Sequence, residues 1–256
     1  MRRVSAPSLI WALAILLPVA ALVSMTVGTV NISLADTLSA VVGNSVSQQT
    51  DTILFDIRLP RILLAIFVGA VLASTGAVMQ GLFRNPLADP SLIGVSSGAS
   101  VGASLMIVTA GGFIQSGALV GLSLVAVGAF VGGFAATLLV YRLATSGIGT
   151  SVTTMLLAGI AIGALAGALN SLLSYFSDND MLRQISLWQM GNLSGASWLK
   201  VSIMGAVAIF LMLLFPRESK ALNALLLGES EARHLGIDVQ RVKRRLIILT
   251  ALGVGV

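Results

Sequence analysis

Cysteine is absent from the 256 residues, and histidine occurs once, as His234. The chain can therefore form no disulfide or thiolate metal site, and it has no cysteine nucleophile. Charged residues make up only 10% of the sequence, against about 25% in soluble domains. The sequence has no G-x-S-x-G, H-E-x-x-H or Walker A lysine motif, and no carboxylate pair lies within an apolar run. These absences predict a protein that is not an enzyme.

Apolar residues fill most of the remaining sequence, at 56%, and the mean hydropathy is +0.98. Crossing a bilayer takes about 20 apolar residues. We expect an all-α, polytopic transmembrane helix bundle that forms one domain over residues 1–256. The first run is too long for a signal-peptide core and has no clear cleavage site, so we expect it to be retained. The predicted spans are Leu9–Val27, Ile62–Phe83, Leu92–Ala110, Gly117–Tyr141, Val152–Tyr175 and Trp198–Phe215, with a seventh that begins near Leu246 and is truncated at Val256.

The positions of lysine and arginine predict the orientation, because these residues favour the cytoplasmic side of a membrane. With the N-terminus inside, eleven of the fifteen basic residues are cytoplasmic. The four exceptions are Arg58, Arg61, Arg183 and Lys200. No basic stripe is interleaved with aromatic residues, so topology explains the net charge of +5 better than nucleic-acid binding does. The eleven are Arg2, Arg3, Arg84, Arg142, Arg217, Lys220, Arg233, Arg241, Lys243, Arg244 and Arg245.

Glycines recur at four-residue spacing within the predicted helices, a pattern that lets helix backbones approach closely in lipid. We interpret them as packing positions. They are Gly94 with Gly98, Gly117 with Gly121, Gly128 with Gly132, and Gly159 with Gly163 and Gly167.

Three connecting segments carry further signals. Arg58 and Arg61 share a helix face at the predicted outer surface, where they could anchor the helix by snorkelling or dock a partner. The segment from Arg84 to Ala99 has two prolines around a tight inner turn, which could be a gate loop or a plain turn, and Ser91 could cap the next helix. The segment Leu222–Gly236 predicts one amphipathic cytoplasmic helix that ends at Gly236. Shorter outer helices are expected within Asn31–Gln49 and Asp178–Ser197.

The predicted spans contain almost no ionisable residues, whereas proton-coupled transporters usually need such groups at mid-bilayer depth. A partner ATPase is then the simplest energy source. His234 lies in the inner segment, where we expect an ordinary interface residue rather than a metal or haem ligand.

Three strings resemble a known family: RLPRILLAIFVGAVLASTGAVMQGLFRNPLADPSLIGVSSGAS at 58–100, ISLWQMGNLSGASW at 185–198 and LLLGESEARHLGIDV at 225–239. They are similar to the BtuC/FecCD permeases of type II ABC importers for vitamin B12, ferric siderophores and haem. The resemblance implies ten helices per subunit, of which about six and a half are present here. It also implies a second copy of the chain, two ATP-binding subunits that hold ATP and Mg, and a periplasmic substrate-binding protein. No cofactor or metal is expected on the permease itself.

The resemblance also implies roles for individual residues. Arg58 and Arg61 correspond to arginines that dock the binding protein, and Asn85 and Leu87 to residues near the cytoplasmic gate. The segment 222–236 resembles the coupling helix that contacts the ATPase. Its recognisable positions are Gly228, Glu229, Ala232, Leu235 and Gly236.

The sequences of the three strings look closest to those of haem permeases, so we expect haem import across a bacterial inner membrane by alternating access. Ferric siderophore and cobalamin are the alternatives within the family. A channel or secondary carrier that works alone is the alternative from a different class, and a membrane scaffold is a third.

Overall fold

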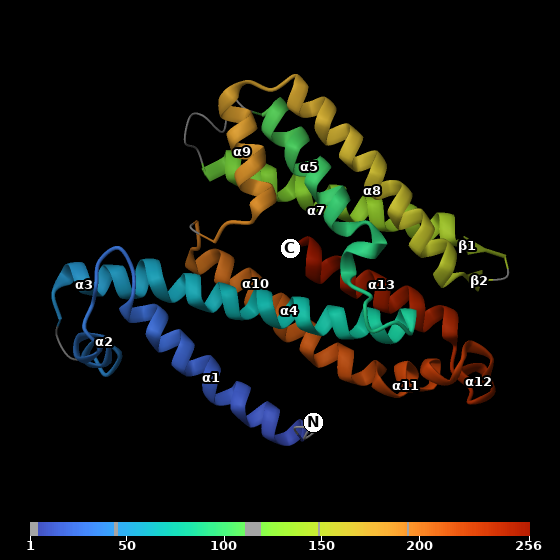
Figure 1. Ribbon diagram of the computed structural model, residues 1–256, viewed down its shortest axis with the longest axis horizontal. Coiled ribbons are helices and arrows are strands. Elements are labelled where there is room, and N and C mark those ends of the chain that lie inside the picture. Colours follow the sequence, from blue (N-terminus) through green and yellow to red (C-terminus); the bar gives the residue numbers. More distant parts are fainter. Residues whose placement is uncertain (1–4, 44–45, 111–118, 148, 194) are drawn as a thin grey trace. The chain divides into compact units, whose positions relative to one another are not determined.

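The computed structural model describes residues 5–43, 46–110, 119–147, 149–193 and 195–256 (Figure 1). In these residues the chain is helical apart from one antiparallel hairpin, in which β1 (Thr145–Ser146) pairs with β2 (Gly149–Thr150). The predicted all-α class is confirmed. The chain divides into two compact units, Met1–Phe67 with Leu193–Gly205 and Val68–Asn192 with Ala206–Val256.

The first unit contains three helices that each begin at a serine cap. The side chains of Ser5, Ser33 and Ser47 accept hydrogen bonds from backbone N–H groups of the first turns, which have no partner within the helix. The expected helix within Asn31–Gln49 is α2. A small core joins the loop and helix ends, through Met25, Ile32, Ala40 and Leu54. The elements are α1 (Ala6–Thr26), α2 (Leu34–Val41), α3 (Gln48–Thr52), the π-helical η1 (Ile53–Arg58) and the first turns of α4 (Leu59–Phe83) and α10 (Trp198–Leu214).

The second unit is built around α5 (Val95–Thr109), α7 (Leu119–Ala144) and α8 (Val152–Tyr175), which pack against one another (Figure 1). The expected helix within Asp178–Ser197 is α9, and its Ile185 and Trp188 pack on the α5–α7 core. The remaining elements are the later parts of α4 and α10, η2 (Pro90–Ile93), α9 (Asn179–Met190), η3 (Phe215–Glu218), α11 (Ser219–Leu227), α12 (Glu229–His234) and α13 (Val239–Gly255).

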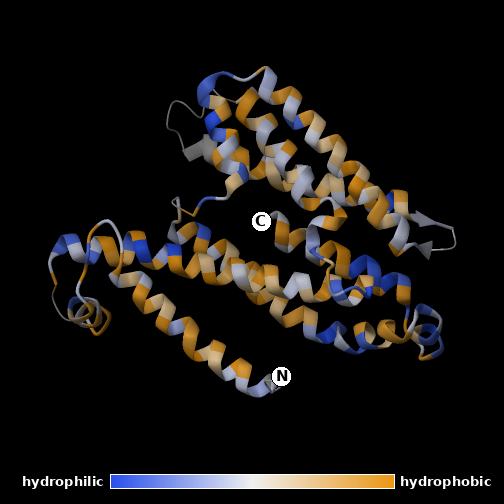
Figure 2. Cartoon of the chain, in the orientation of Figure 1, coloured by the Kyte–Doolittle hydropathy of each residue, from blue (hydrophilic) through white to orange (hydrophobic). Residues whose placement is uncertain are grey.

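Five helical segments in the described part are long and apolar enough to cross a membrane, and Figure 2 shows their hydrophobic colouring. They correspond to five of the six predicted complete spans. The predicted span Leu92–Ala110 is shorter, at Val95–Thr109, because Gly94 adopts a left-handed conformation with φ +78° and separates η2 from α5. The five are Pro7–Thr26, Gln48–Phe83, Leu124–Ala144, Val152–Tyr175 and Trp198–Leu227.

The predicted seventh helix is α13, and it begins seven residues earlier than the expected start near Leu246. The Asp238 side chain accepts a hydrogen bond from the Arg241 N–H and caps the helix. The basic residues at 241, 243, 244 and 245 therefore lie inside the helix rather than in the preceding loop. Sequence reasoning placed them in a loop because their charge masks the helical period.

Glycine packing is confirmed for α5 and α7. A Cβ atom on Gly98 would lie 2.3 Å from the Gly132 carbonyl oxygen, and a Cβ atom on Gly128 would lie 2.3 Å from the Cγ of Met106. On α8, Gly159 packs tightly against the Leu92 carbonyl, whereas a Cβ atom on Gly167 would meet nothing within 4 Å. In the predicted pair of Gly117 with Gly121, Gly117 lies outside the described residues.

Candidate functional site

Arg58, in the first unit, closes the end of α1. Its guanidinium donates hydrogen bonds to the carbonyl oxygens of Met25, in the last turn of α1, and Val30, in the loop that follows. A cation at this place stabilises the carbonyl end of a helix. A Cβ atom on Gly28 would lie 2.6 Å from Nη2 of Arg58, so the guanidinium would have to shift to accommodate a larger residue there. Arg61 lies exposed in the first turn of α4. The docking role of both arginines stays a prediction.

The turn after α4 is held by backbone hydrogen bonds and by the side chains of Asn85 and Asp89. The N–H of Asn85 bonds to the Gln80 carbonyl, while Arg84 takes a positive φ of +50°. Oδ1 of Asn85 accepts a hydrogen bond of 2.9 Å from the Leu87 N–H. This leaves Leu87 at the tip of the turn with its side chain 87% exposed. The gate role of Asn85 and Leu87 is untested by this geometry.

The expected cap at Ser91 is wrong. Asp89 Oδ1 accepts a hydrogen bond of 2.6 Å from the Ser91 N–H and caps η2, so Ser91 is the capped residue. The following helix, α5, starts after Gly94 without a side-chain cap. Asp side chains readily accept a hydrogen bond from the backbone N–H two residues on, and serine hydroxyls do so more weakly, which favours the cap at Asp89.

The segment predicted as one helix over 222–236 consists of two helices. Gly228, with φ +128°, separates α11 from α12, a conformation that L side chains rarely adopt. The predicted end at Gly236 is confirmed: its φ is +80°, and the N–H groups of Gly236 and Ile237 bond to the Arg233 and Ala232 carbonyls. This is a Schellman motif.

The five recognised positions of this segment have different surroundings. Ala232 is fully buried, and Glu229 binds Lys243 in the second turn of α13. Leu235 is 65% exposed, next to the exposed Gly236. Leu226 and Leu227 are exposed as well, so α11 and α12 present apolar side chains on a polar segment. Such a surface suits a protein partner, and the ATPase-coupling role remains a prediction.

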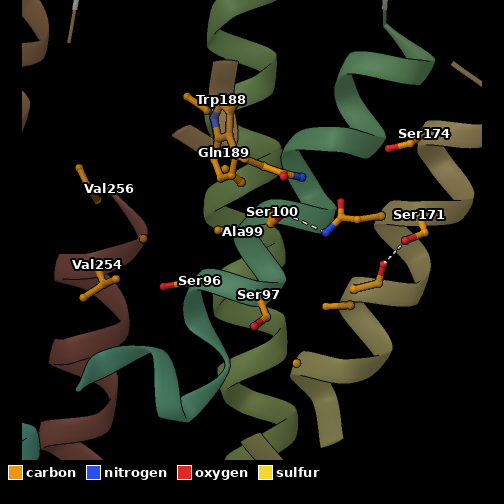
Figure 3. Close-up of a pocket in the computed structure, with 17 residues that line it drawn as sticks. Ser96, Ser97, Ala99, Ser100, Ser171, Ser174, Trp188, Gln189, Val254 and Val256 are labelled. Carbon is orange, nitrogen blue, oxygen red and sulfur yellow. Dashed lines mark hydrogen bonds between the residues drawn. The ribbon is translucent and has the colours of Figure 1, made fainter. Parts of the chain in front are cut away.

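A cavity of about 1070 Å³ lies within the second unit, between α5, α7, α8, α9 and the end of α13 (Figure 3). Nδ2 of Asn170 donates a hydrogen bond of 2.9 Å to Ser100 Oγ across it. Oδ1 of Asn170 is buried and has no hydrogen-bond partner among the described residues. Charged side chains do not line the described wall. Its polar residues are Ser96, Ser97, Ser100, Asn170, Ser171, Ser174, Trp188 and Gln189.

Sequence reasoning missed this cavity, although a signal for it exists. Polar residues recur at i, i+1 and i+4 on two largely apolar helices, as Ser96, Ser97 and Ser100 on α5 and as Asn170, Ser171 and Ser174 on α8. This spacing puts each trio on one helix face. Among the residues described, no group of three or more histidine, aspartate or glutamate side chains is placed to hold a metal ion.

Comparison with known proteins agrees with the helical arrangement. Residues 16–256 match the FecCD transport family. The chain belongs to the FecCD family. This FecCD chain is 41% identical over 243 residues to the hemin transport system permease HmuU of Yersinia pestis, which covers 95% of this chain and 70% of that protein. It is 38% identical over 244 residues to the vitamin B12 import permease BtuC of Salmonella typhi, with the same two coverages.

A solved structure is similar to the FecCD chain as well. It is described as an inward-facing conformation of a metal-chelate type ABC transporter, and it matches with a TM-score of 0.80 and 30% identity over 97% of this chain and 74% of that one. The FecCD chain is therefore a permease subunit of a type II ABC importer and a multi-pass protein of the inner membrane. Its family carries out transport rather than catalysis, and membership implies ATPase partners and a substrate-binding protein.

Proposed function

We propose that this permease imports haem, which it receives from a periplasmic binding protein and passes to the cytoplasm by alternating access. The similarity to the hemin permease of Yersinia pestis, at 41% identity over 95% of the chain, carries the proposal. The permease acts as a homodimer with two ATPase subunits, which bind the ATP and Mg. The residues of the permease supply the binding surfaces and a helix bundle with two conformations, which the binding protein and the ATPase subunits stabilise to different degrees.

The lining of the cavity supports haem as the substrate. Haem has a flat apolar ring and two carboxylates. A wall of small residues with one Trp and no charged side chain suits the ring, and serine hydroxyls can donate hydrogen bonds to carboxylates. Weak contacts spread over such a wall let a substrate leave as well as enter.

Cobalamin is the second candidate, because a cobalamin permease of Halobacterium salinarum is 40% identical over 207 residues, 81% of this chain and 54% of that protein. This identity is within a few per cent of the value for the hemin permease. Ferric siderophores are the third candidate, as family substrates. The lone channel, the secondary carrier and the scaffold remain as outcomes for the experiment below.

Three surfaces serve this cycle in our proposal. Arg58 and Arg61 dock the binding protein on the periplasmic side, and Asn85 and Leu87 lie near the cytoplasmic gate. The segment 222–236 contacts the ATPase, with Gly228, Glu229, Leu235 and Gly236 at its surface and the buried Ala232 holding it in place. This assignment takes the N-terminus as cytoplasmic, as the basic residues predict.

The test is uptake by proteoliposomes that contain the permease with its ATPase subunits and its binding protein. Haem, cyanocobalamin and a ferric hydroxamate are compared at equal concentration, each with ATP inside the vesicles. Haem uptake that needs hydrolysable ATP supports the proposal, and ATP-driven uptake of cobalamin or the hydroxamate alone would overturn haem. Flux driven by an ion gradient without ATPase would overturn the importer cycle, and no flux under any condition would favour the scaffold. The matched control is an ATPase whose Walker A lysine is replaced.

A further inference from the structure

Lys243 is a buried cation in a chain that has few charges. Its side chain is 1% exposed, in the second turn of α13. Nζ donates a hydrogen bond of 2.6 Å to Oε1 of Glu229 and one of 2.7 Å to the carbonyl oxygen of Thr150. Gln240, one turn earlier, accepts a hydrogen bond of 2.9 Å from the Thr150 N–H. The start of α13 therefore holds both backbone polar groups of Thr150 and the first residue of α12.

These contacts do not break independently of one another. A buried ammonium without its partners is strongly unfavourable, so Lys243 must keep Glu229 and Thr150 close wherever it moves. The exposed pair of Glu229 with Arg233 is different: the atoms are 3.9 Å apart, the Arg233 side chain is 57% exposed, and such pairs contribute little. Glu229 is thus held mainly by Lys243.

The segments that meet at Lys243 lead to different places in the second unit. Glu229 begins α12, directly after the break at Gly228. Thr150 ends the hairpin that joins α7 to α8, and α8 supplies Asn170 and its neighbours to the cavity wall. The far end of α13 supplies Val254, Gly255 and Val256 to the same wall (Figure 3). Because α13 is one unbroken helix of 17 residues, it connects Lys243 directly to that wall.

We propose that Lys243 is the positioning residue that couples α12 to the cavity wall. The inference rests on the proposed function in one respect, because it takes α11 and α12 as the surface that the ATPase moves. In this arrangement α12, the β1–β2 hairpin and the start of α13 move as one body when the ATPase acts. The displacement then reaches the cavity through α8 and α13. Without Lys243, α12 pivots at Gly228 and the cavity wall does not follow.

The experiment compares Lys243→Met with Arg241→Gln, which removes one positive charge from the same helix and breaks only the exposed pair with Asp238. In proteoliposomes with the ATPase subunits and the binding protein, we measure substrate molecules moved per ATP hydrolysed. We expect Lys243→Met to hydrolyse ATP while that ratio falls at least about 5-fold, the lower end of typical coupling between sites. Arg241→Gln should keep the wild-type ratio.

A second readout does not depend on the substrate. The chain has no cysteine, so spin labels at Ser230→Cys and Ser174→Cys report the distance from α12 to the cavity end of α8 without a background signal. If α12 and the wall move together, ATP changes this distance less in the wild type than in Lys243→Met, where α12 pivots alone. Equal changes in the two proteins, with an unaltered transport ratio, would overturn the inference.

Folding and the proposed function are controlled separately. If Lys243→Met fails to assemble, the double variant Lys243→Met with Glu229→Gln removes both charges, which is far less disruptive than leaving one buried. The double variant should assemble and show the same low transport ratio, and a wild-type ratio in it would also overturn the inference. If the wild-type permease does not co-purify with the ATPase, the proposed contact of α12 fails, and this inference fails with it. If the wild-type permease couples ATP hydrolysis to transport and the Lys243 variants couple equally well, only the role of Lys243 is rejected.

Discussion

Replacing Gly102 by alanine is a sharp test of how α5 and α7 pack. A Cβ atom on Gly102 would lie 2.0 Å from the Gly128 carbonyl oxygen and 3.2 Å from the Gly132 Cα. Relaxed carbon–oxygen contacts are about 3.3 Å or longer. The two helices must therefore separate locally by roughly 1.3 Å to accommodate one methyl group. Because the atoms that collide belong to the backbone, no side-chain rotation relieves the overlap.

The magnitude follows from two opposing effects. Overpacking a well-packed interior costs typically about 1–3 kcal/mol, and the backbone collision places this site at the upper end. Alanine regains about 1 kcal/mol of helix propensity relative to glycine. We expect Gly102→Ala to lower the free energy of unfolding by about 2 kcal/mol.

Gly167→Ala on α8 is the matched control, because a Cβ atom there meets nothing within 4 Å. Only the propensity gain remains, so this variant should be unchanged or more stable by up to about 1 kcal/mol. The two variants then differ by about 3 kcal/mol, which is roughly 100-fold in the unfolding equilibrium. Unfolding in mixed micelles can be followed by tryptophan fluorescence, because Trp188 packs on the α5–α7 core. Equal stability of the two variants would refute the close packing.

Three further predictions use other parts of the chain. Arg61→Glu should lower the apparent affinity with which the binding protein stimulates ATPase activity by at least about 10-fold, because the glutamate would repel the acidic residues that the arginine attracts. ATPase activity without the binding protein reports assembly of the complex, and unchanged stimulation would contradict the docking role. Arg58→Glu would in addition remove the hydrogen bonds that Arg58 donates to the carbonyl oxygens of Met25 and Val30. Arg84→Gly should raise the free energy of unfolding by about 1 kcal/mol, because glycine tolerates the positive φ of this turn. A lower unfolding midpoint would contradict this. In intact cells, a membrane-impermeant maleimide should label Gln49→Cys and spare Ser230→Cys, and the reverse pattern would overturn the predicted orientation.

Hydropathy was enough to predict five of the six complete spans, because the bilayer requires long apolar runs whatever the tertiary structure. The starts of α1, α2 and α3 were also readable in principle, since each follows a serine that caps the first turn. Packing at Gly98, Gly128 and Gly132 followed from spacing alone. The sequence signals for these features lie within a few turns of one helix.

Other features depend on contacts that sequence spacing does not reveal. Gly228 reads as an ordinary helical position until its φ of +128° is known, and the break decides that α12 starts at Glu229. Lys243 counts as one more cytoplasmic charge in the sequence. Its partner Thr150 is 93 residues away, so only the fold shows that the side chain is buried.

The charges at the start of α13 show why topology and mechanism are linked in this chain. Positive residues there orient the helix, yet three of them also have acidic partners in the second unit: Arg241 with Asp238, Lys243 with Glu229, and Arg245 with Glu218. Glu218 is itself buried, at the end of η3. Removing any one of these basic residues therefore changes both the orientation signal and an internal contact. A variant that lowers transport can be assigned to coupling only when labelling shows that its orientation is unchanged, and for that reason the cysteine-accessibility measurement should precede every coupling measurement on α13.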